Sequence, residues 1–165
     1  MKKIFALTLS ALLLLSLFAC NGGAAYKNNV DVDVLADKAI ACIPLSNGYS
    51  DWDGDAVDYY FGDAENLADY EVYVSRDGND HNLFGIFKAK NSGDVNTIKS
   101  ACENFIKKYS SDISGSILNY APGEAEKFSN AKVTVYGDYV LVTILSSSDT
   151  SAVCTAVENA LKADK

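Results

Sequence analysis

The order of strands and helices constrains the fold more than any other feature of this sequence. Two segments rich in β-branched and aromatic residues, 70–74 (YEVYV) and 83–89 (LFGIFKA), are separated by a polar turn that contains glycine. This pattern predicts a β-hairpin. The stretch that follows has apolar residues at helical spacing and an N-cap at Ser92 or Asp94, so it predicts an amphipathic helix.

The same order occurs again near the C-terminus. The segments 131–136 (AKVTVY) and 139–145 (YVLVTIL) flank Gly137-Asp138. Glycine in the first position suits a two-residue hairpin turn. A second amphipathic segment, SDTSAVCTAVENALKAD, comes next and predicts a second helix.

The two strand–strand–helix units also align with each other. A shift of 55 residues superposes Ile98 on Val153, and the other apolar positions of the two helices follow. We therefore expect an internal duplication of two ββα units, at about residues 70–109 and 131–163. Ile98 and Val153 should then occupy matching core positions under one sheet.

These units predict the fold class. A single hairpin is only marginally stable, but two joined hairpins with helices can enclose a core. We expect an α+β fold in which the two repeats form an antiparallel sheet with the helices packed on one face. The residues expected on the opposite, outward face are Tyr73, Thr134, Tyr136 and Thr143.

A further helix is expected before the two units. The segment DVLADKAIACIP has Asp33 as its cap and ends at Pro44. Its apolar face should contain Leu35, Ala39, Cys42 and Ile43.

The N-terminus indicates export. Lys2 and Lys3 precede an apolar run from Ile4 to Phe18, which is short for a membrane span but suits a signal peptide. The run ends in LFAC, which resembles the lipobox of bacterial lipoproteins. That resemblance implies cleavage after residue 19 and diacylation of Cys20.

The expected mature protein is an anchored single domain. Two acyl chains hold a protein stably on a bilayer, so the predicted location is the extracytoplasmic face of the cell membrane. Residues 20–29 contain small and polar residues and predict a flexible tether, followed by one α+β domain over residues 30–165. Loss of Lys2 and Lys3 changes the net charge from −8 to −10, which argues against nucleic acid as a partner.

The remaining cysteines offer little chemistry. Cys42, Cys102 and Cys154 are an odd number without CxxC spacing, and His81 is the only histidine. We interpret the three thiols as inert core residues rather than as a disulfide or a zinc site.

The stretch YSDWDGDAVDYYFGD resembles a calcium loop at first sight, because Asp51, Asp53 and Asp55 alternate. An EF-hand loop starting at Asp51 needs glycine in its sixth position and glutamate in its twelfth. These positions hold Ala56 and Gly62. The three aspartates are therefore weak candidates for a metal site, and we interpret the stretch as a short helix capped by Asp53 or Asp55.

The sequence favours binding over catalysis. It has no phosphate-binding glycine loop, no GxSxG and no HExxH, so it indicates no cofactor and no nucleophile. We expect a non-catalytic binding or assembly module for an envelope protein or a small ligand. The alternative is a small envelope hydrolase of the carboxylate-pair, glycosidase type, because such an enzyme needs only two suitably spaced acids.

Several motifs together resemble a known family. They are the lipobox, the capped helix near Asp33, VYVS before a polar turn, GIFKAKNSGDV, and YAPGEAEKFSNAKVTVYGDYVLVTI. The chain resembles a family of uncharacterised lipoproteins of Gram-positive, largely gut-dwelling anaerobic bacteria, classified as a domain of unknown function. The resemblance implies the location and the fold, and it transfers no catalytic residue.

Overall fold

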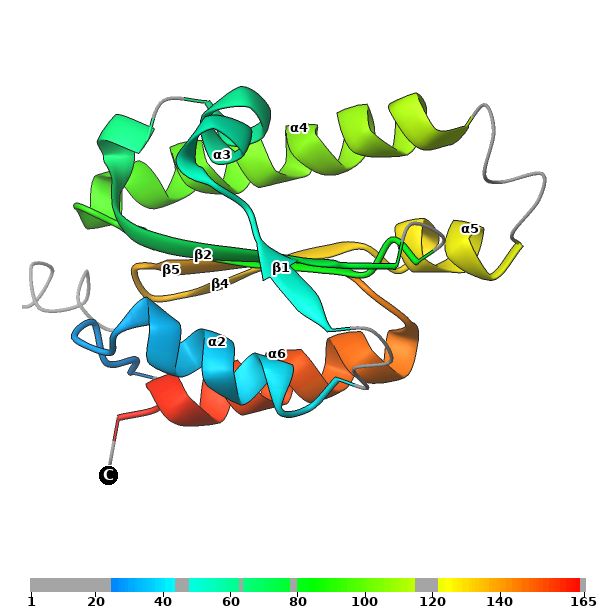
Figure 1. Cartoon of the computed structure of the whole chain (residues 1–165). Helices are drawn as coiled ribbons and strands as arrows, with labels where there is room; N and C mark the ends of the chain where they lie inside the picture. The colour runs from blue at the N-terminus through cyan, green and yellow to red at the C-terminus, as the bar shows by residue number, and fades with distance from the viewer. Residues whose placement is uncertain (1–24, 44–47, 63, 78–79, 115–121, 164–165) are drawn as a thin grey trace, which may run out of the picture.

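The computed structural model describes residues 25–43, 48–62, 64–77, 80–114 and 122–163 (Figure 1). The expected signal peptide and Cys20 lie outside these residues. Within them, no helix is both long enough and apolar enough to cross a bilayer.

A five-stranded antiparallel sheet forms the centre of the fold, in the order β1-β2-β3-β5-β4. Its strands are β1 (Tyr49–Asp51), β2 (Leu67–Ser75), β3 (Leu83–Ala89), β4 (Lys132–Tyr136) and β5 (Tyr139–Ile144). The two predicted hairpins, β2–β3 and β4–β5, are confirmed. They join along β3 and β5, and the short β1 extends the sheet beyond the predicted four strands.

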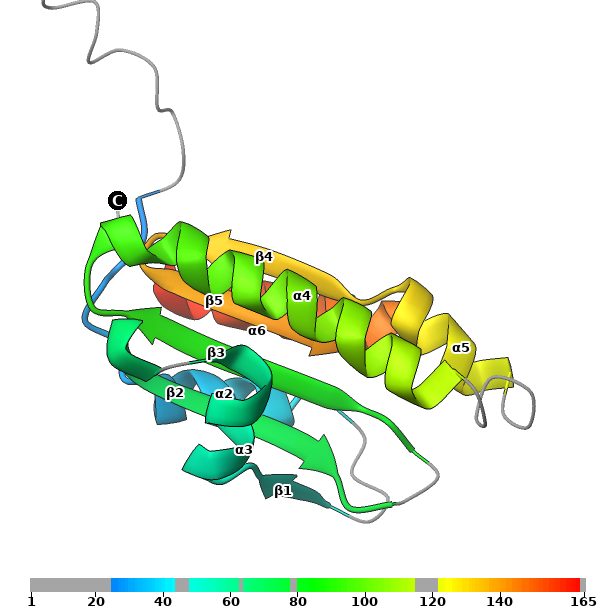
Figure 2. The same ribbon diagram turned by 90° about the horizontal axis from the view of Figure 1, so that it is seen from above.

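Helices cover both faces of this sheet (Figures 1 and 2). The helices are α2 (Val32–Ile40), α3 (Gly54–Phe61), α4 (Val95–Ser114), α5 (Pro122–Ser129) and α6 (Ser147–Leu161), with single 3₁₀ turns η2 (Ala64–Asn66) and η3 (Ser92–Asp94). Helices α3 and α4 lie on one face, and α2 and α6 lie side by side on the other. Helix α5 lies at the end of the sheet that is far from the C-terminus.

The sheet separates two hydrophobic cores. Side chains of the central strands point alternately to the two faces of the sheet. Phe84 and Leu141 pack with α2 and α6, while Phe87 and Val142 pack with α4. Every residue of β5 is buried. Central strands with two covered faces need apolar residues at nearly every position, and this explains the continuous runs LFGIF and YVLVTI.

The α+β class and the antiparallel sheet are confirmed, but the prediction that the helices pack on one face is wrong. Ile98 of α4 belongs to one core and Val153 of α6 belongs to the other. Because β3 and β5 are antiparallel neighbours, a rotation that superposes the two hairpins would put both helices on the same face. The helix of each ββα unit instead packs on a different face of the sheet, so a rotation that superposes the two hairpins does not superpose the two helices. The internal duplication is therefore not confirmed.

The predicted outward residues are covered for the same reason. Thr143 and Tyr136 are buried, and Tyr73 packs partly buried against the α2–α6 core. Thr134 is half-buried, 3.9 Å from the Cys154 sulfur. Alternation of polar residues in these strands does not mark a solvated face here.

The expected N-terminal helix is present as α2, with Val32, Leu35, Ala36 and Ala39 buried. It begins after Asp31, so Asp33 lies in its first turn and is not the N-cap. Its end also differs from the expectation, because Cys42 is exposed beyond the helix.

The packed region begins before the expected Val30. Tyr26 pairs with Lys162 in an isolated β-bridge, and the Lys27 amide donates to the Leu161 carbonyl over 2.7 Å. The Tyr26 Cβ also lies 3.3 Å from the position that a Cβ on Gly137 would occupy. The segment Ala25–Lys27 therefore docks on the end of α6 and on the β4–β5 turn.

Candidate functional site

The acidic stretch forms a capped helix, as the sequence indicates. Asp53 is the N-cap of α3, and its Oδ1 accepts a hydrogen bond of 2.9 Å from the Ala56 amide. Gly62 ends the helix with a φ of +83°, which suits glycine. Asp51 ends β1 and Asp55 lies in the first turn of α3.

These aspartates do not form a metal cluster in the structure. Among the residues that it describes, no group of three or more His, Cys, Asp or Glu side chains is placed to hold a metal ion. The Asp53 carboxylate is already engaged by the backbone of α3. The local geometry therefore supports the cap interpretation of this stretch.

A row of aromatic side chains packs along α3 and α4 at the border of the core that contains Phe105. Trp52 stacks on Tyr60 with 4.9 Å between ring centroids, and Tyr60 meets Tyr109 edge-on at 6.1 Å. Tyr59 packs edge-on against Tyr60 at 4.9 Å and is 69% exposed. We call Trp52, Tyr59, Tyr60 and Tyr109 the aromatic row.

A lysine fixes the exposed end of this row. The Lys108 ammonium lies 4.0 Å from the ring centroid of Tyr59 and 5.3 Å from that of Tyr60. A cation over a ring face is attracted by the ring quadrupole. This contact holds Tyr59 in place even though most of its ring meets solvent. Tyrosine presents a broad apolar face and a polar tip, so the row suits binding.

A polar cluster lies at the other end of the row. The His81 ring packs against Tyr109 and Phe128, with centroids 6.5 and 6.3 Å apart. The backbone amide of His81 donates to Glu124 Oε2 over 2.8 Å. Lys127 Nζ contacts both Asp80 Oδ1 at 2.5 Å and Glu124 Oε1 at 2.7 Å.

This polar cluster joins two distant parts of the chain. Glu124 and Lys127 lie on α5, and Asp80 and His81 lie in the β2–β3 turn. Glu124 is 9% exposed, so its charge needs the partners that it has. The ion pairs therefore fasten α5 to the turn and hold His81 at the edge of the aromatic row.

The charge state of Asp80 follows from its surroundings. Partial burial raises the pKa of this carboxyl, but hydrogen bonds from Lys127 and from the Asn82 amide, together with the Lys127 charge, outweigh burial and lower it. For Lys127, burial lowers the pKa, and the two carboxylates reverse the effect and raise it. Asp80 is thus stabilised as a carboxylate and Lys127 as an ammonium ion.

Neighbouring polar groups are less completely satisfied. His81 Nε2 and Asn82 Oδ1 are buried and have no hydrogen-bond partner among the described residues. Burial raises the pKa of the adjacent Tyr49 to about 12, opposed by the Asn82 side chain and reinforced by Asp80 and Asp149. Buried polar atoms without a protein partner are commonly met by water or a ligand.

The cysteines are free thiols in three different settings. Cys102 is buried, Cys154 is half-buried and Cys42 is exposed. The core placement is therefore confirmed for Cys102 and wrong for Cys42. Burial raises the pKa of the Cys102 thiol, which disfavours the reactive thiolate.

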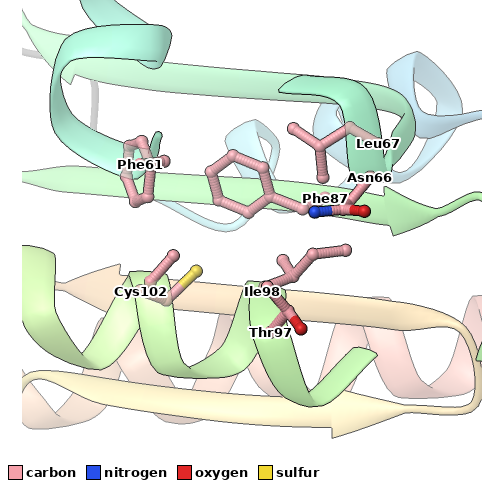
Figure 3. Close-up of a pocket in the computed structure, with 8 residues that line it drawn as sticks. Phe61, Asn66, Leu67, Phe87, Thr97, Ile98 and Cys102 are labelled. Atoms are coloured by element: carbon pink, nitrogen blue, oxygen red, sulfur yellow. The ribbon is translucent and has the colours of Figure 1, made fainter. Parts of the chain in front are cut away.

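Cys102 lines a cavity of about 30 Å³ between α4 and the α3–η2 segment, with Phe61, Phe87 and Ile98 (Figure 3). The space is comparable to that of a single water molecule. A partly open, mostly apolar space of this size is a packing defect of the core rather than a ligand site.

Sequence reasoning did not identify the aromatic row or the polar cluster. A signal for the row was present, because Tyr59, Tyr60 and Phe61 are consecutive within the acidic stretch, and Phe105 and Tyr109 have the i, i+4 spacing of one helix face. The contact of Asp80 with Lys127 has no such local signal, since it depends on how α5 returns to the sheet.

The fold and these surfaces define a class of protein: a small α+β domain with one antiparallel sheet covered on both faces. A comparison with protein families matches residues 41–145 to a domain of unknown function, DUF4358, and the chain belongs to this family. The matched region contains the whole sheet, the aromatic row and the polar cluster, but neither α2 nor α6. No curated protein and no solved structure matched the chain.

Proposed function

We propose that this protein is a lipid-anchored, extracytoplasmic binding or assembly module that contacts its partner through the aromatic row. The proposal combines the lipobox-like sequence before Cys20 with an aromatic row whose exposed member is Tyr59. The partner is an envelope protein or a small ligand, and no nucleic acid is expected because the mature chain is strongly acidic.

The docked N-terminal segment leaves only a short tether between the proposed lipid anchor and the folded domain. Ala25 already bonds to the C-terminal part of the chain, since the Ala163 amide donates to the Ala25 carbonyl over 3.0 Å. A fully extended chain spans at most about 3.6 Å per residue, so Ala25 would stand no more than about 18 Å from Cys20. The domain would then sit close to the bilayer, with the end formed by Tyr26 and Lys162 toward the lipid.

The observation that carries the binding proposal is the exposure of Tyr59. Tyr59 is 69% exposed, and the Lys108 ammonium lies 4.0 Å from its ring centroid, so the residue presents an apolar ring and a polar tip to solvent. Rigid aromatic side chains lose little entropy on binding and are enriched at protein interfaces.

Cell fractionation tests the anchor. A Cys20→Ala variant expressed in the native host should leave the membrane fraction and appear in the medium or in the wash. A Cys42→Ala variant is the control, because it removes an exposed free thiol of the folded domain. Unchanged membrane retention of Cys20→Ala would contradict the lipid anchor.

Site-specific photo-crosslinking on living cells tests the binding surface. A photoreactive phenylalanine at Tyr59 should give a recurrent product, whereas the same group at Val34 should not. Val34 is 43% exposed and lies on α2, across the sheet from the row. Equal products at both positions would show that contact is nonspecific, and no product at Tyr59 would reject the row as the surface.

The glycosidase alternative is less well supported. Asp80 and Glu124 are two carboxylates of the polar cluster that the fold brings together, but Lys127 sits between them. A general acid needs a raised pKa, whereas the pKa of Asp80 is lowered. Hydrolysis of a cell-wall or dietary glycan that disappears with both Asp80→Asn and Glu124→Gln would reverse this preference.

A further inference from the structure

Strand β4 is the last strand on one edge of the sheet (Figure 2). Tyr136 and Tyr139 flank the two-residue turn and form a hydrogen-bonded pair. Because such pairs alternate along an antiparallel ladder, Thr134 and Lys132 also exchange backbone hydrogen bonds with β5. The amide and carbonyl groups of Val133 and Val135 therefore point away from β5. No described strand pairs with them.

This edge lacks most of the devices that usually prevent strand addition. Natural edge strands are blunted by prolines, bulges, charges or very short length. Strand β4 is a regular five-residue strand, KVTVY, with its one charge at the first position and no register shift. The other edge differs, because β1 has three residues and the β2–β3 pair beside it has a register shift between Leu67 and Asp69.

An open groove runs beside the free edge on the α4 side. It has a volume of about 340 Å³, and its apolar part comes from Ile106, Ala131 and Val133. Val135 is 37% exposed and is one of only three large hydrophobic residues that are exposed in the described structure. A strand added at β4 would send alternate side chains toward this groove.

The charges around the edge favour an acidic segment. Glu103 at the groove is neutralised by Lys99 at 2.8 Å. Lys107 and Lys132 also line the groove and form no ion pair with any described residue. The edge is therefore locally positive on a protein whose overall charge is negative.

We propose that β4 binds an extended, acidic segment of a partner protein by β-strand addition. Backbone hydrogen bonds to Val133 and Val135 provide affinity, an apolar side chain enters the groove, and an acidic side chain meets Lys107 or Lys132. This surface differs from the aromatic row, and the inference does not depend on the lipid anchor.

A random peptide library displayed on phage, panned against the full chain in detergent, provides the probe. Enriched peptides should combine acidic with β-branched residues. Their affinity is then measured by fluorescence anisotropy on the wild type, on Val135→Pro and on Val135→Thr. Proline removes the outward amide that the added strand needs, so Val135→Pro should weaken binding at least about tenfold, while Val135→Thr should not.

Charge reversal gives a second measurement that does not depend on the proline variant folding. Lys107→Glu and Lys132→Glu should each weaken binding several-fold. Lys38→Glu changes the net charge equally on the exposed side of α2 and should have no effect. Both lysine effects should decrease at high salt.

Three results would overturn the proposal. One is the absence of any enriched peptide, and another is equal binding to the wild type, Val135→Pro and the lysine variants. The third is a concentration-dependent dimer, seen by sedimentation, that Val135→Pro dissociates while peptide affinity stays the same in both proteins. That result would assign the edge to a second copy of this chain.

Discussion

Tyr26 packs edge-on against Tyr136, with ring centroids 5.5 Å apart and the planes at 73°. The contact joins the first described segment of the chain to the last hairpin. The Tyr26 hydroxyl also donates to Glu158 Oε1 at 3.4 Å, so one side chain connects β4 and α6.

Replacing Tyr26 with alanine should loosen this connection. An edge-to-face aromatic pair contributes about 0.5–1.5 kcal/mol beyond its buried area, so Tyr26→Ala should lower the free energy of unfolding by about 1 kcal/mol or more. Hydrogen exchange at the Lys27 amide should become much faster. Tyr26→Phe is the control, because it keeps the ring contact, and exchange as fast in Tyr26→Phe as in Tyr26→Ala would contradict the role of the ring.

Removing the cap of α3 should destabilise the protein modestly. Loss of an aspartate N-cap costs about 0.5–2 kcal/mol, so Asp53→Ala should lower the urea midpoint accordingly. Asp55→Ala removes the same charge from the first turn of α3 without removing the cap hydrogen bond. Equal losses in the two variants would show that charge, not capping, matters.

Calcium should have little effect on stability. A specific ligand at a hundredfold excess over its Kd raises the free energy of unfolding by about 2.7 kcal/mol. Because Asp53 is engaged by the Ala56 amide, we expect millimolar calcium to leave the melting temperature nearly unchanged. A rise of several degrees that disappears with Asp51→Asn plus Asp53→Asn would establish a calcium site.

Truncation of Ile98 should be severe. Ile98 is 6% exposed and borders the cavity of about 30 Å³ next to Cys102, so the space left by Ile98→Ala would merge with an existing void. Such substitutions cost about 2–5 kcal/mol. Val34→Ala, on an exposed part of α2, should change stability by no more than about 0.5 kcal/mol. A small loss for Ile98→Ala in urea denaturation would contradict this packing.

The polar cluster should make stability depend on acid pH. The folded pKa of Asp80 lies below its unfolded value of about 3.9, so its stabilisation is complete above that pH and is lost as pH falls through the folded pKa. Below about pH 4, the urea midpoint of Asp80→Asn should therefore change less with pH than the urea midpoint of the wild type. If the wild type and Asp80→Asn lose the same stability as the pH falls, the ion pair of Asp80 with Lys127 does not contribute to the stability of the fold.

Much of the fold could be predicted from local patterns. Helical periodicity located α4 and α6, and the turn at Gly137 located the β4–β5 hairpin, because each signal lies within a few adjacent residues. The face on which each helix packs is not encoded locally. The runs LFGIF and YVLVTI did carry the missing information, since strands that are apolar at successive positions indicate two covered faces.

The candidate site was harder to predict, because its contacts cross long stretches of sequence. The cap at Asp53 was predictable, since donor and acceptor lie three residues apart. The contact of Lys127 with Asp80 spans 47 residues and that of Glu124 with the His81 amide spans 43. Both depend on the position of α5, which no motif within either segment specifies.

The docking of Tyr26 and Lys27 on the end of α6 has a consequence for how the chain folds. The Lys27 amide bonds to Leu161, so closing this contact joins positions that are separated by nearly the whole domain. Loop-closure entropy rises with the length of the loop, and contacts between such distant positions usually form late. If the chain is exported as proposed, the segment Ala25–Lys27 should therefore remain undocked until the last helix has been translocated. Translocation of α6 and completion of the fold would then coincide.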